Sequence, residues 1–215
     1  MMSLTRKGLV GILAAGVAMF GAVAGAVQVQ PDGGAVKPKA KVGEKAPEFK
    51  LVDIEGKEHK LSEYTAQGKI VVLEWFNADC PYVKKHHVDN KTMANAYNEL
   101  KDQNVVWLAI NTGADGKQGA GLDRNKKAKR DYKIEYPILL DQTGDVGRSY
   151  VAKTTPHMYV ISETGVLLYA GAIDNDPSPR KVGEIIYPVQ AIKQHKAGET
   201  ITDPETEAYG CSVKY

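Results

Sequence analysis

The sequence has few cysteines, almost no net charge and no internal repeat. Its 215 residues include only two cysteines, Cys80 and Cys211, and the formal net charge is +2. A charge so close to neutral gives no sign of a nucleic-acid partner, and the one dense basic run, RNKKAKR at 124–130, has the spacing of a solvated helix face. The Gly-rich stretch GADGKQGAG at 113–121 lacks the spacing of a phosphate-binding loop, so we expect a surface loop. The ordinary balance of apolar and charged residues predicts one soluble globular domain with additions at its ends.

The N-terminus contains the pattern of an export signal. Arg6 and Lys7 precede a short apolar stretch, and small residues stand before a cut after Ala26. We therefore expect a signal peptide over 1–26, a flexible linker over 27–41 that is rich in Gly, Pro and Lys, and an exported protein, periplasmic or extracellular. The apolar part is shorter than a comfortable membrane span, and an uncleaved membrane anchor is the alternative.

Residues 42–198 alternate between strand-like and helix-like segments. KIVVLEWFN and VVWLAINTG are continuous apolar runs, typical of strands buried on both faces. VKKHHVDNKTMANAYNELKD has apolar residues near helical spacing, and the strands HMYVIS and VLLYAGAI flank the turn ETG before a last helix. This order predicts an α/β domain with a central mixed sheet flanked by helices, followed by an extended polar tail over 199–215 that carries Cys211.

Cys80 stands where the apolar run VVLEWFN ends and a helical pattern begins. Asn77 and Asp79 are good helix-capping residues, and Pro81 suits the first helical position because its missing N–H is not needed there. The unpaired N–H groups and the dipole at a helix start favour a thiolate, which is the nucleophilic form of cysteine. Lys84, one turn further on, would act in the same direction, whereas Asp79 would oppose it. We therefore predict that Cys80 is a reactive thiol; the alternative is a small buried apolar residue.

Several motifs, in their order along the chain, resemble a known family. Five segments look like those of the thioredoxin-fold redoxins of the alkyl hydroperoxide reductase and thiol-specific antioxidant (AhpC/TSA) superfamily. They are GEKAPEFKLVDIEGKEHKLSEY, VVLEWFNADCPYVKKH, YPILLDQTGDVGRSY, TTPHMYVIS and GVLLYAGAID. CPYVKKH together with the ending YGCSVKY is similar to a peroxiredoxin-like branch of thioredoxin-domain proteins. The resemblance covers about residues 42–215.

This resemblance implies a thioredoxin-like fold in which Cys80 is the attacking cysteine. Thr155 and Pro156 then match the threonine and cis proline beside which an extended substrate pairs with free backbone groups; a trans proline that opens a strand is the alternative. Trp75 and Pro81, on either side of the Cys80 turn, are further candidates for contacting the substrate, and core packing explains Trp75 equally well.

The chain departs from the patterns of this superfamily at three points. A dithiol thioredoxin has a second cysteine where this chain has Val83, and a typical peroxiredoxin has threonine or serine where it has Asn77. No arginine stands next to Thr155 in the sequence, and Arg148 and Arg180 are the nearest candidates. A peroxidase proper is therefore one alternative, and a redox-silent binding module that keeps the fold is another.

A reaction at Cys80 requires a second thiol. Attack on a peroxide leaves a sulfenic acid and attack on a disulfide leaves a mixed disulfide. Cys211 follows Gly210 in the tail and is the candidate for resolving either intermediate; a structural disulfide with Cys80, an intermolecular partner and a Cys211 without a role remain open.

The predicted activity is thus that of an exported thiol oxidoreductase that acts on a protein disulfide or a peroxide. It would be reduced by an external thiol, such as a thioredoxin-like protein, and it would touch a membrane only if the N-terminal segment stays uncleaved. We expect no organic cofactor and no metal, because sulfur itself carries the electrons.

Three histidines are candidates for supporting roles. His157 follows Pro156 and could assist proton transfer at Cys80. His86 and His87 suggest a metal site with Cys80, but on a helix His87 lies about 10 Å from Cys80. We therefore expect these two histidines on a solvated helix face.

Overall fold

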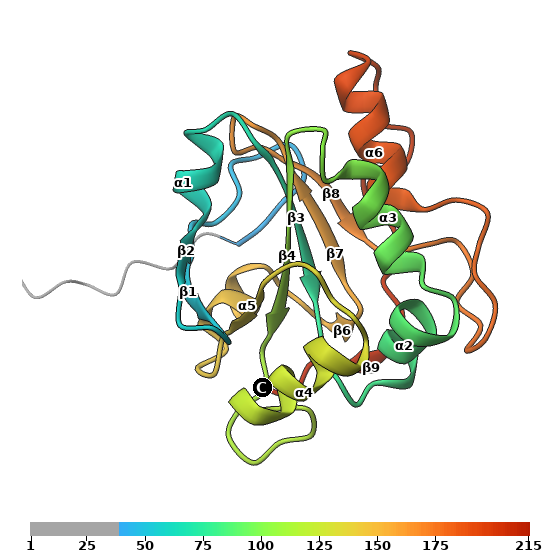
Figure 1. Ribbon diagram of the computed structural model, residues 1–215. Helices are drawn as coiled ribbons and strands as arrows, with labels where there is room; N and C mark the ends of the chain where they lie inside the picture. The colour runs from blue at the N-terminus through green and yellow to red at the C-terminus, as the bar shows by residue number, and fades with distance from the viewer. Residues whose placement is uncertain (1–38) are drawn as a thin grey trace, which may run out of the picture. The chain divides into compact units, whose positions relative to one another are not determined.

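Strands and helices alternate through the part of the chain that the structure, a computed structural model, describes, residues 39–215 (Figure 1). The strands are β1 Lys50–Asp53, β2 Glu58–Lys60, β3 Ile70–Trp75, β4 Val105–Asn111, β5 Ile138–Leu140, β6 Thr154–Thr155, β7 Met158–Ile161, β8 Leu167–Gly171 and β9 Cys211–Ser212. The helices are α1 Leu61–Thr65, α2 Pro81–Lys84, α3 Thr92–Leu100, α4 Leu122–Asp131, α5 Asp145–Ser149 and α6 Tyr187–Lys196. A π-helical turn, η1 Lys85–Asp89, continues α2. The predicted α/β class is confirmed.

Seven strands form the central sheet in the order β2-β1-β5-β4-β3-β7-β8. β3 is parallel to β4, which is parallel to β5, whereas β7 is antiparallel to β3 and β8 is antiparallel to β7. Every residue of β3 is buried, because helices cover both faces of the sheet. This explains why its sequence is a continuous apolar run.

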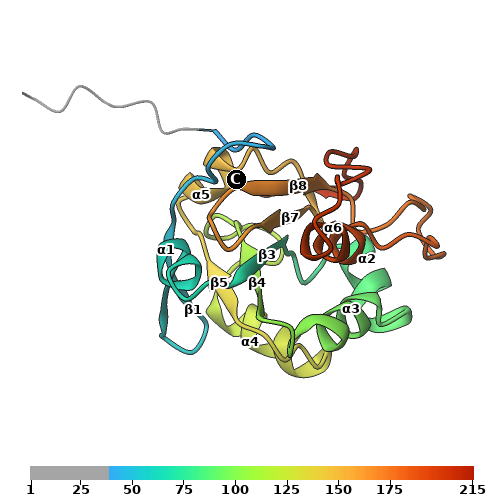
Figure 2. The same ribbon diagram turned by 90° about the horizontal axis from the view of Figure 1, so that it is seen from above.

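The sheet separates two hydrophobic cores. Successive residues of a strand point to opposite faces, so Val72 packs in a first core with α3 and α6, while Val71 and Trp75 pack in a second core with α1. Figure 2 shows α1 and α5 on one side of the sheet and α3 and α6 on the other. Cys80 belongs to the first core, so the site is built on that side.

The C-terminal segment returns to the domain and packs against it. The Ala170 amide donates to Pro204 O at 3.1 Å, and the Thr206 amide donates to Ala170 O at 3.1 Å. Further on, β9 pairs with β6 in a separate two-stranded sheet, with Thr155 opposite Cys211. The end of the chain is therefore a structural part of the domain.

The predicted signal peptide, 1–26, lies outside the described residues, and so does the predicted linker, 27–41, except for residues 39–41. Within that last stretch the Ala40 amide donates to Ser149 O at 2.8 Å. Between residues 39 and 215, no helix combines the length and the apolar character needed to cross a bilayer.

Candidate active site around Cys80 and Cys211

Cys80 lies directly at the start of a helix. It is the N-cap residue of α2, with Pro81 in the first turn. The Cys80 amide donates to Asn77 O at 3.1 Å, and Cys80 O accepts the Lys84 amide at 3.0 Å. The predicted position at a strand-to-helix corner is confirmed.

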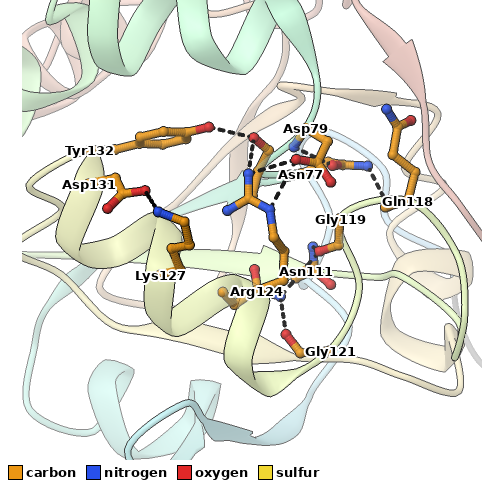
Figure 3. A network of polar contacts seen from close by, with 12 residues as sticks. Asn77, Asp79, Asn111, Gln118, Gly119, Gly121, Arg124, Lys127, Asp131 and Tyr132 are labelled. Carbon is orange, nitrogen blue, oxygen red and sulfur yellow. Dashed lines mark hydrogen bonds and ion pairs between the residues drawn. The ribbon is translucent and has the colours of Figure 1, made fainter.

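A network of polar contacts fixes the turn before Cys80 (Figure 3). The Asn77 side chain accepts the Asp79 amide on Oδ1 at 2.8 Å and donates from Nδ2 to Gln118 O at 3.1 Å. The next residue, Gly119, approaches so closely that an added Cβ would lie 1.9 Å from Asn77 Oδ1. Its φ of +76° is also in the region that favours glycine. The Gly-rich loop, expected as a surface loop, therefore also packs against the Cys80 turn.

Arg124 is a residue of this site that the sequence analysis did not single out. Its guanidinium donates to Asp79 Oδ1 at 2.6 Å and to Ala78 O at 3.0 Å, and the Tyr132 hydroxyl donates to Ala78 O at 2.6 Å (Figure 3). The basic run 124–130 is thus not simply a solvated face, because one side of α4 holds the turn. The only signal in the sequence is the spacing of Arg124 and Tyr132, which places both on one side of a helix.

Thr155 and Pro156 face Cys80 from the opposite side. The peptide bond between them is cis, as expected from the resemblance. The Cys80 Sγ donates to Thr155 O at 3.0 Å, and Thr155 is itself buried. The structure therefore brings the predicted attacking cysteine and the predicted Thr–Pro pair into direct contact.

Cys211 lies beside Cys80, and both cysteines are free thiols. In the β6–β9 pair Cys211 is opposite Thr155, whose Oγ1 donates to Cys211 O at 3.4 Å. Burial, followed by the hydrogen bond to Cys80 and the Cys80 charge, raises the pKa of Cys211 to about 11. The two cysteines are thus neighbours in space despite their separation in the sequence.

The tail leaves Cys80 almost no access to solvent. Cys80 is 1% exposed, and both Tyr209 and Cys211 pack against the core that contains it. Gly210 has a φ of +131°, and a Cβ at this position would lie 2.2 Å from Thr155 O. Burial agrees with the alternative of an apolar filler, but the contacts of the sulfur with a carbonyl and a second thiol do not.

Before Cys211, the Tyr209 hydroxyl holds the tail to the segment after Cys80. It donates to Asp174 Oδ1 and accepts from Lys85 Nζ at 3.2 Å and from His86 Nε2 at 2.9 Å. Lys85 Nζ also donates to Asp176 O at 2.7 Å. Burial lowers the pKa of Lys85, against the charges of both aspartates. We call Lys85, His86, Asp174 and Tyr209 the tyrosine latch.

The expectation that His86 and His87 lie on a solvated helix face is wrong. Both are buried, because η1 turns them into the protein and the tail covers His86. Burial lowers the pKa of His86 to about 4, and its Nδ1 has no hydrogen-bond partner among the described residues. His87 Nε2 pairs instead with Glu74 Oε1 at 2.7 Å, and the Tyr136 hydroxyl donates to Glu74 Oε2 at 2.7 Å.

After Cys211, the chain is anchored again. The Val213 amide donates to Lys153 O at 3.0 Å, and Lys214 O accepts the Ala114 amide at 2.9 Å. The Tyr215 hydroxyl donates to Ala152 O at 2.8 Å. The tail is therefore fixed on both sides of the cysteine.

Two predicted site residues lie on the other face of the sheet. Trp75 is 0% exposed in the second core, and its Nε1 donates to Thr112 Oγ1 at 3.0 Å. His157 contacts Tyr159 of the same core, with Nδ1 3.1 Å from the Tyr159 hydroxyl oxygen. The alternation of side chains along β3 and β7 explains both positions, since Cys80 lies on the first-core face. Trp75 thus does not line the approach to Cys80, and the geometry gives His157 no contact with its thiol.

Pro81 and Lys84 are exposed on α2. In the described part of the chain, no three His, Cys, Asp or Glu side chains come together in a way that could hold a metal ion. The contacts that hold the two cysteines are those of Cys80 Sγ with Thr155 O and of Cys211 O with Thr155 Oγ1.

Comparisons with known proteins agree with this geometry. The chain is 31% identical over 129 residues to thiol-disulfide oxidoreductase ResA of Geobacillus kaustophilus, which is 60% of this chain and 68% of that protein. It is 22% identical over 161 residues to a chloroplastic 2-cysteine peroxiredoxin of Chattonella marina var. antiqua, covering 71% of this chain and 80% of that protein. The crystal structure of the thioredoxin domain of a thiol-disulfide oxidoreductase from Bacteroides vulgatus superposes with a TM-score of 0.52 at 19% identity, covering 74% of this chain and 99% of that one. The predicted thioredoxin-like fold is confirmed.

The match to a family model extends over the site and most of the sheet. The model of the AhpC/TSA family matches residues 42–170, a stretch that includes Cys80, Thr155 and Pro156 but not Cys211. Because the match covers more than half of the sequence, and the fold agrees with it, the protein belongs to the AhpC/TSA family.

Proposed function

We propose that this protein is an exported thiol oxidoreductase in which Cys80 attacks a disulfide or a peroxide and Cys211 resolves the intermediate. The observation that carries the proposal is the contact between the two thiols at the start of α2, beside Thr155 and the cis Pro156. The relatives named thiol-disulfide oxidoreductase and 2-cysteine peroxiredoxin support the same reaction class. The export pattern at the N-terminus supports a site of action where thiols are oxidised.

In the first step the Cys80 thiolate attacks an electrophilic sulfur or oxygen. With a disulfide RSSR, an S–S bond forms between Cys80 and RS, and the second RS⁻ leaves. With a hydroperoxide ROOH, an S–O bond forms, Cys80 becomes a sulfenic acid, and the O–O bond breaks to release RO⁻, which takes up the proton that the Cys80 thiol gave up and becomes ROH. The clamped turn before Cys80 and the contact of its Sγ with Thr155 O hold the sulfur in place for this attack.

In the second step Cys211 attacks the Cys80 sulfur. A Cys80–Cys211 disulfide forms, and either RS⁻ or hydroxide is displaced; the Cys211 proton ends on that leaving group, giving RSH or water. The raised pKa of Cys211 means that the thiol carries this proton near neutral pH.

In the third step an external thiol reduces the disulfide. Two thiols of a reductant supply two electrons, are oxidised to a disulfide and return Cys80 and Cys211 to the free state. A thioredoxin-like protein outside the cytoplasm has the required chemistry.

The test compares the full-length protein with Cys80→Ser and Cys211→Ser. Consumption of hydrogen peroxide and of oxidised glutathione is measured with dithiothreitol as the reductant, and the oxidised protein is analysed by mass spectrometry. We expect Cys80→Ser to lower consumption of both oxidants to the rate measured with dithiothreitol and no protein. Without dithiothreitol, Cys211→Ser should complete one turnover that leaves Cys80 as a sulfenic acid or a mixed disulfide. Unchanged turnover by Cys80→Ser would refute the proposal. A wild-type disulfide that resists dithiothreitol would favour a redox-silent module.

A further inference from the structure

The edge of β6 that an extended substrate would use is already occupied. The resemblance to thioredoxin-fold redoxins implies that a substrate pairs with backbone groups beside the cis proline. In the structure, Thr154 pairs with Ser212 and Thr155 pairs with Cys211. A sheet edge gives affinity for a polypeptide through unpaired main-chain groups, and this edge has its own strand in place. A polypeptide could bind here only after that strand leaves.

The contact between the strand and the edge is close. Thr155 O lies 3.0 Å from the Cys80 Sγ, and it is the same oxygen that an added Cβ on Gly210 would approach to 2.2 Å. Only a residue without a side chain allows the tail to come this near to the sulfur's partner. The tail therefore packs in direct contact with the backbone oxygen that accepts the Cys80 thiol.

Release of the whole tail requires the loss of many contacts. The tyrosine latch holds the chain on one side of Cys211, and Val213, Lys214 and Tyr215 hold it on the other. A displacement of Cys211 alone leaves these two anchors in place. Local openings that break few contacts are far more frequent than large ones.

We propose that the tail segment, residues 209–215, excludes polypeptide disulfides and restricts Cys80 to small oxidants, namely hydroperoxides and low-molecular-weight disulfides. The inference rests on the proposed function, because it assumes that Cys80 is the attacking thiol. The shared chemistry of these substrates is a weak O–O or S–S bond in a molecule small enough to meet Cys80 when only Cys211 moves. The bonds that form and break are those of the two steps given above.

The test compares two proteins that both lack the resolving thiol. One is full-length Cys211→Ser, which keeps the strand; the other ends at Ala208 and lacks it. The rate constant for loss of the Cys80 thiol is measured with three probes: hydrogen peroxide, oxidised glutathione and the disulfide-bonded polypeptide insulin. We expect removal of the tail to raise the rate with insulin by about tenfold or more relative to the rate with hydrogen peroxide. The two small probes distinguish a hydroperoxide from a small disulfide as the better substrate.

A second variant guards against misfolding of the shortened chain. Tyr209→Phe in the Cys211→Ser background removes the hydroxyl of the latch but keeps the ring and the strand. It is expected to shift the insulin-to-peroxide ratio in the same direction by a smaller factor. Tyr187→Phe on α6 is the matched control, and the ratio should stay unchanged.

The outcomes separate the inference from the proposed function. If insulin reacts as fast relative to hydrogen peroxide with the tail present as without it, the inference is overturned while the proposed function stands. If Cys80 reacts with none of the three probes in either protein, the proposed function fails and the inference fails with it.

Discussion

Replacing Gly210 by alanine should release the tail from β6 without unfolding the domain. An alanine at a φ of +131° costs about 1–3 kcal/mol in backbone strain. Its Cβ would also lie 2.2 Å from Thr155 O, so β9 must move away and lose its hydrogen bonds to β6, each contributing about 0.5–1.5 kcal/mol. A destabilisation of the docked tail by about 2 kcal/mol or more raises its open population at least about thirtyfold.

The assay is alkylation of Cys80 by iodoacetamide in the Cys211→Ser background. Iodoacetamide is small enough to reach Cys80 through local opening at residue 211, and Gly210→Ala favours this opening because its Cβ pushes β9 away from β6. Alkylation should therefore accelerate by about the same thirtyfold or more. Gly198→Ala is the matched control, because Gly198 also has a positive φ, +72°, but no atom lies within 4 Å of the added Cβ. An alkylation rate within twofold of that of the parent protein would refute the view that the tail covers Cys80.

Three further predictions concern the turn, the histidines and the resolving thiol. Gly119→Ala should lower both the free energy of unfolding, measured in urea, and the rate at which Cys80 reacts, because its Cβ would lie 1.9 Å from Asn77 Oδ1. Gly116→Ala is the control, because Gly116 has the same φ of +76° but no atom within 4 Å of the added Cβ, so it shows the effect of backbone strain alone. Burial lowers the pKa values of His86 and His157 to about 4, so the unfolded chain binds more protons below about pH 6.5. The free energy of unfolding should therefore fall as the pH is lowered from about 6.5 to 4, by up to about 3 kcal/mol for each histidine. A urea concentration at the unfolding midpoint that stays constant over this pH range would contradict this prediction. Because burial raises the pKa of Cys211, its thiol is protonated near neutral pH, and rapid-quench mass spectrometry should find disulfide formation accelerating from about pH 6 to 9. A rate independent of pH over this range would argue against Cys211 as the nucleophile.

The order of elements could be predicted because each central strand is a continuous apolar run. The run that ends at Trp75 is buried on both faces, as its composition indicates. The corner at Cys80 was equally predictable, because Asn77 favours a turn and Pro81 favours the first turn of a helix. Local chemistry and the global fold agree at these positions. The helix-capping role expected of Asn77 and Asp79 is wrong: Cys80 is the N-cap of α2 without a side-chain cap bond, and the Asp79 carboxylate pairs with Arg124.

The rest of the site depends on contacts that no local pattern contains. His86 and His87 were misplaced because η1 and the returning tail bury a segment that is polar in sequence. For Trp75, core packing is the correct alternative, and the expected place of His157 near Cys80 was wrong; alternation along a strand separates the two faces but does not say which of them meets Cys80. The partner of Cys80 could be suggested from the sequence, but its proximity depends on pairing across a large sequence separation.

The division of the core by the sheet gives the protein two built-in optical reporters. The chain has two tryptophans, and the sheet places one on each side. Trp75 lies 5.0 Å from the ring of Tyr159 in the second core, and Trp107 lies 5.7 Å from the ring of Tyr136 in the first. In Trp75→Phe, the fluorescence of the remaining Trp107 should report unfolding of the first core, which contains Cys80. In Trp107→Phe, the fluorescence of the remaining Trp75 should report unfolding of the second core.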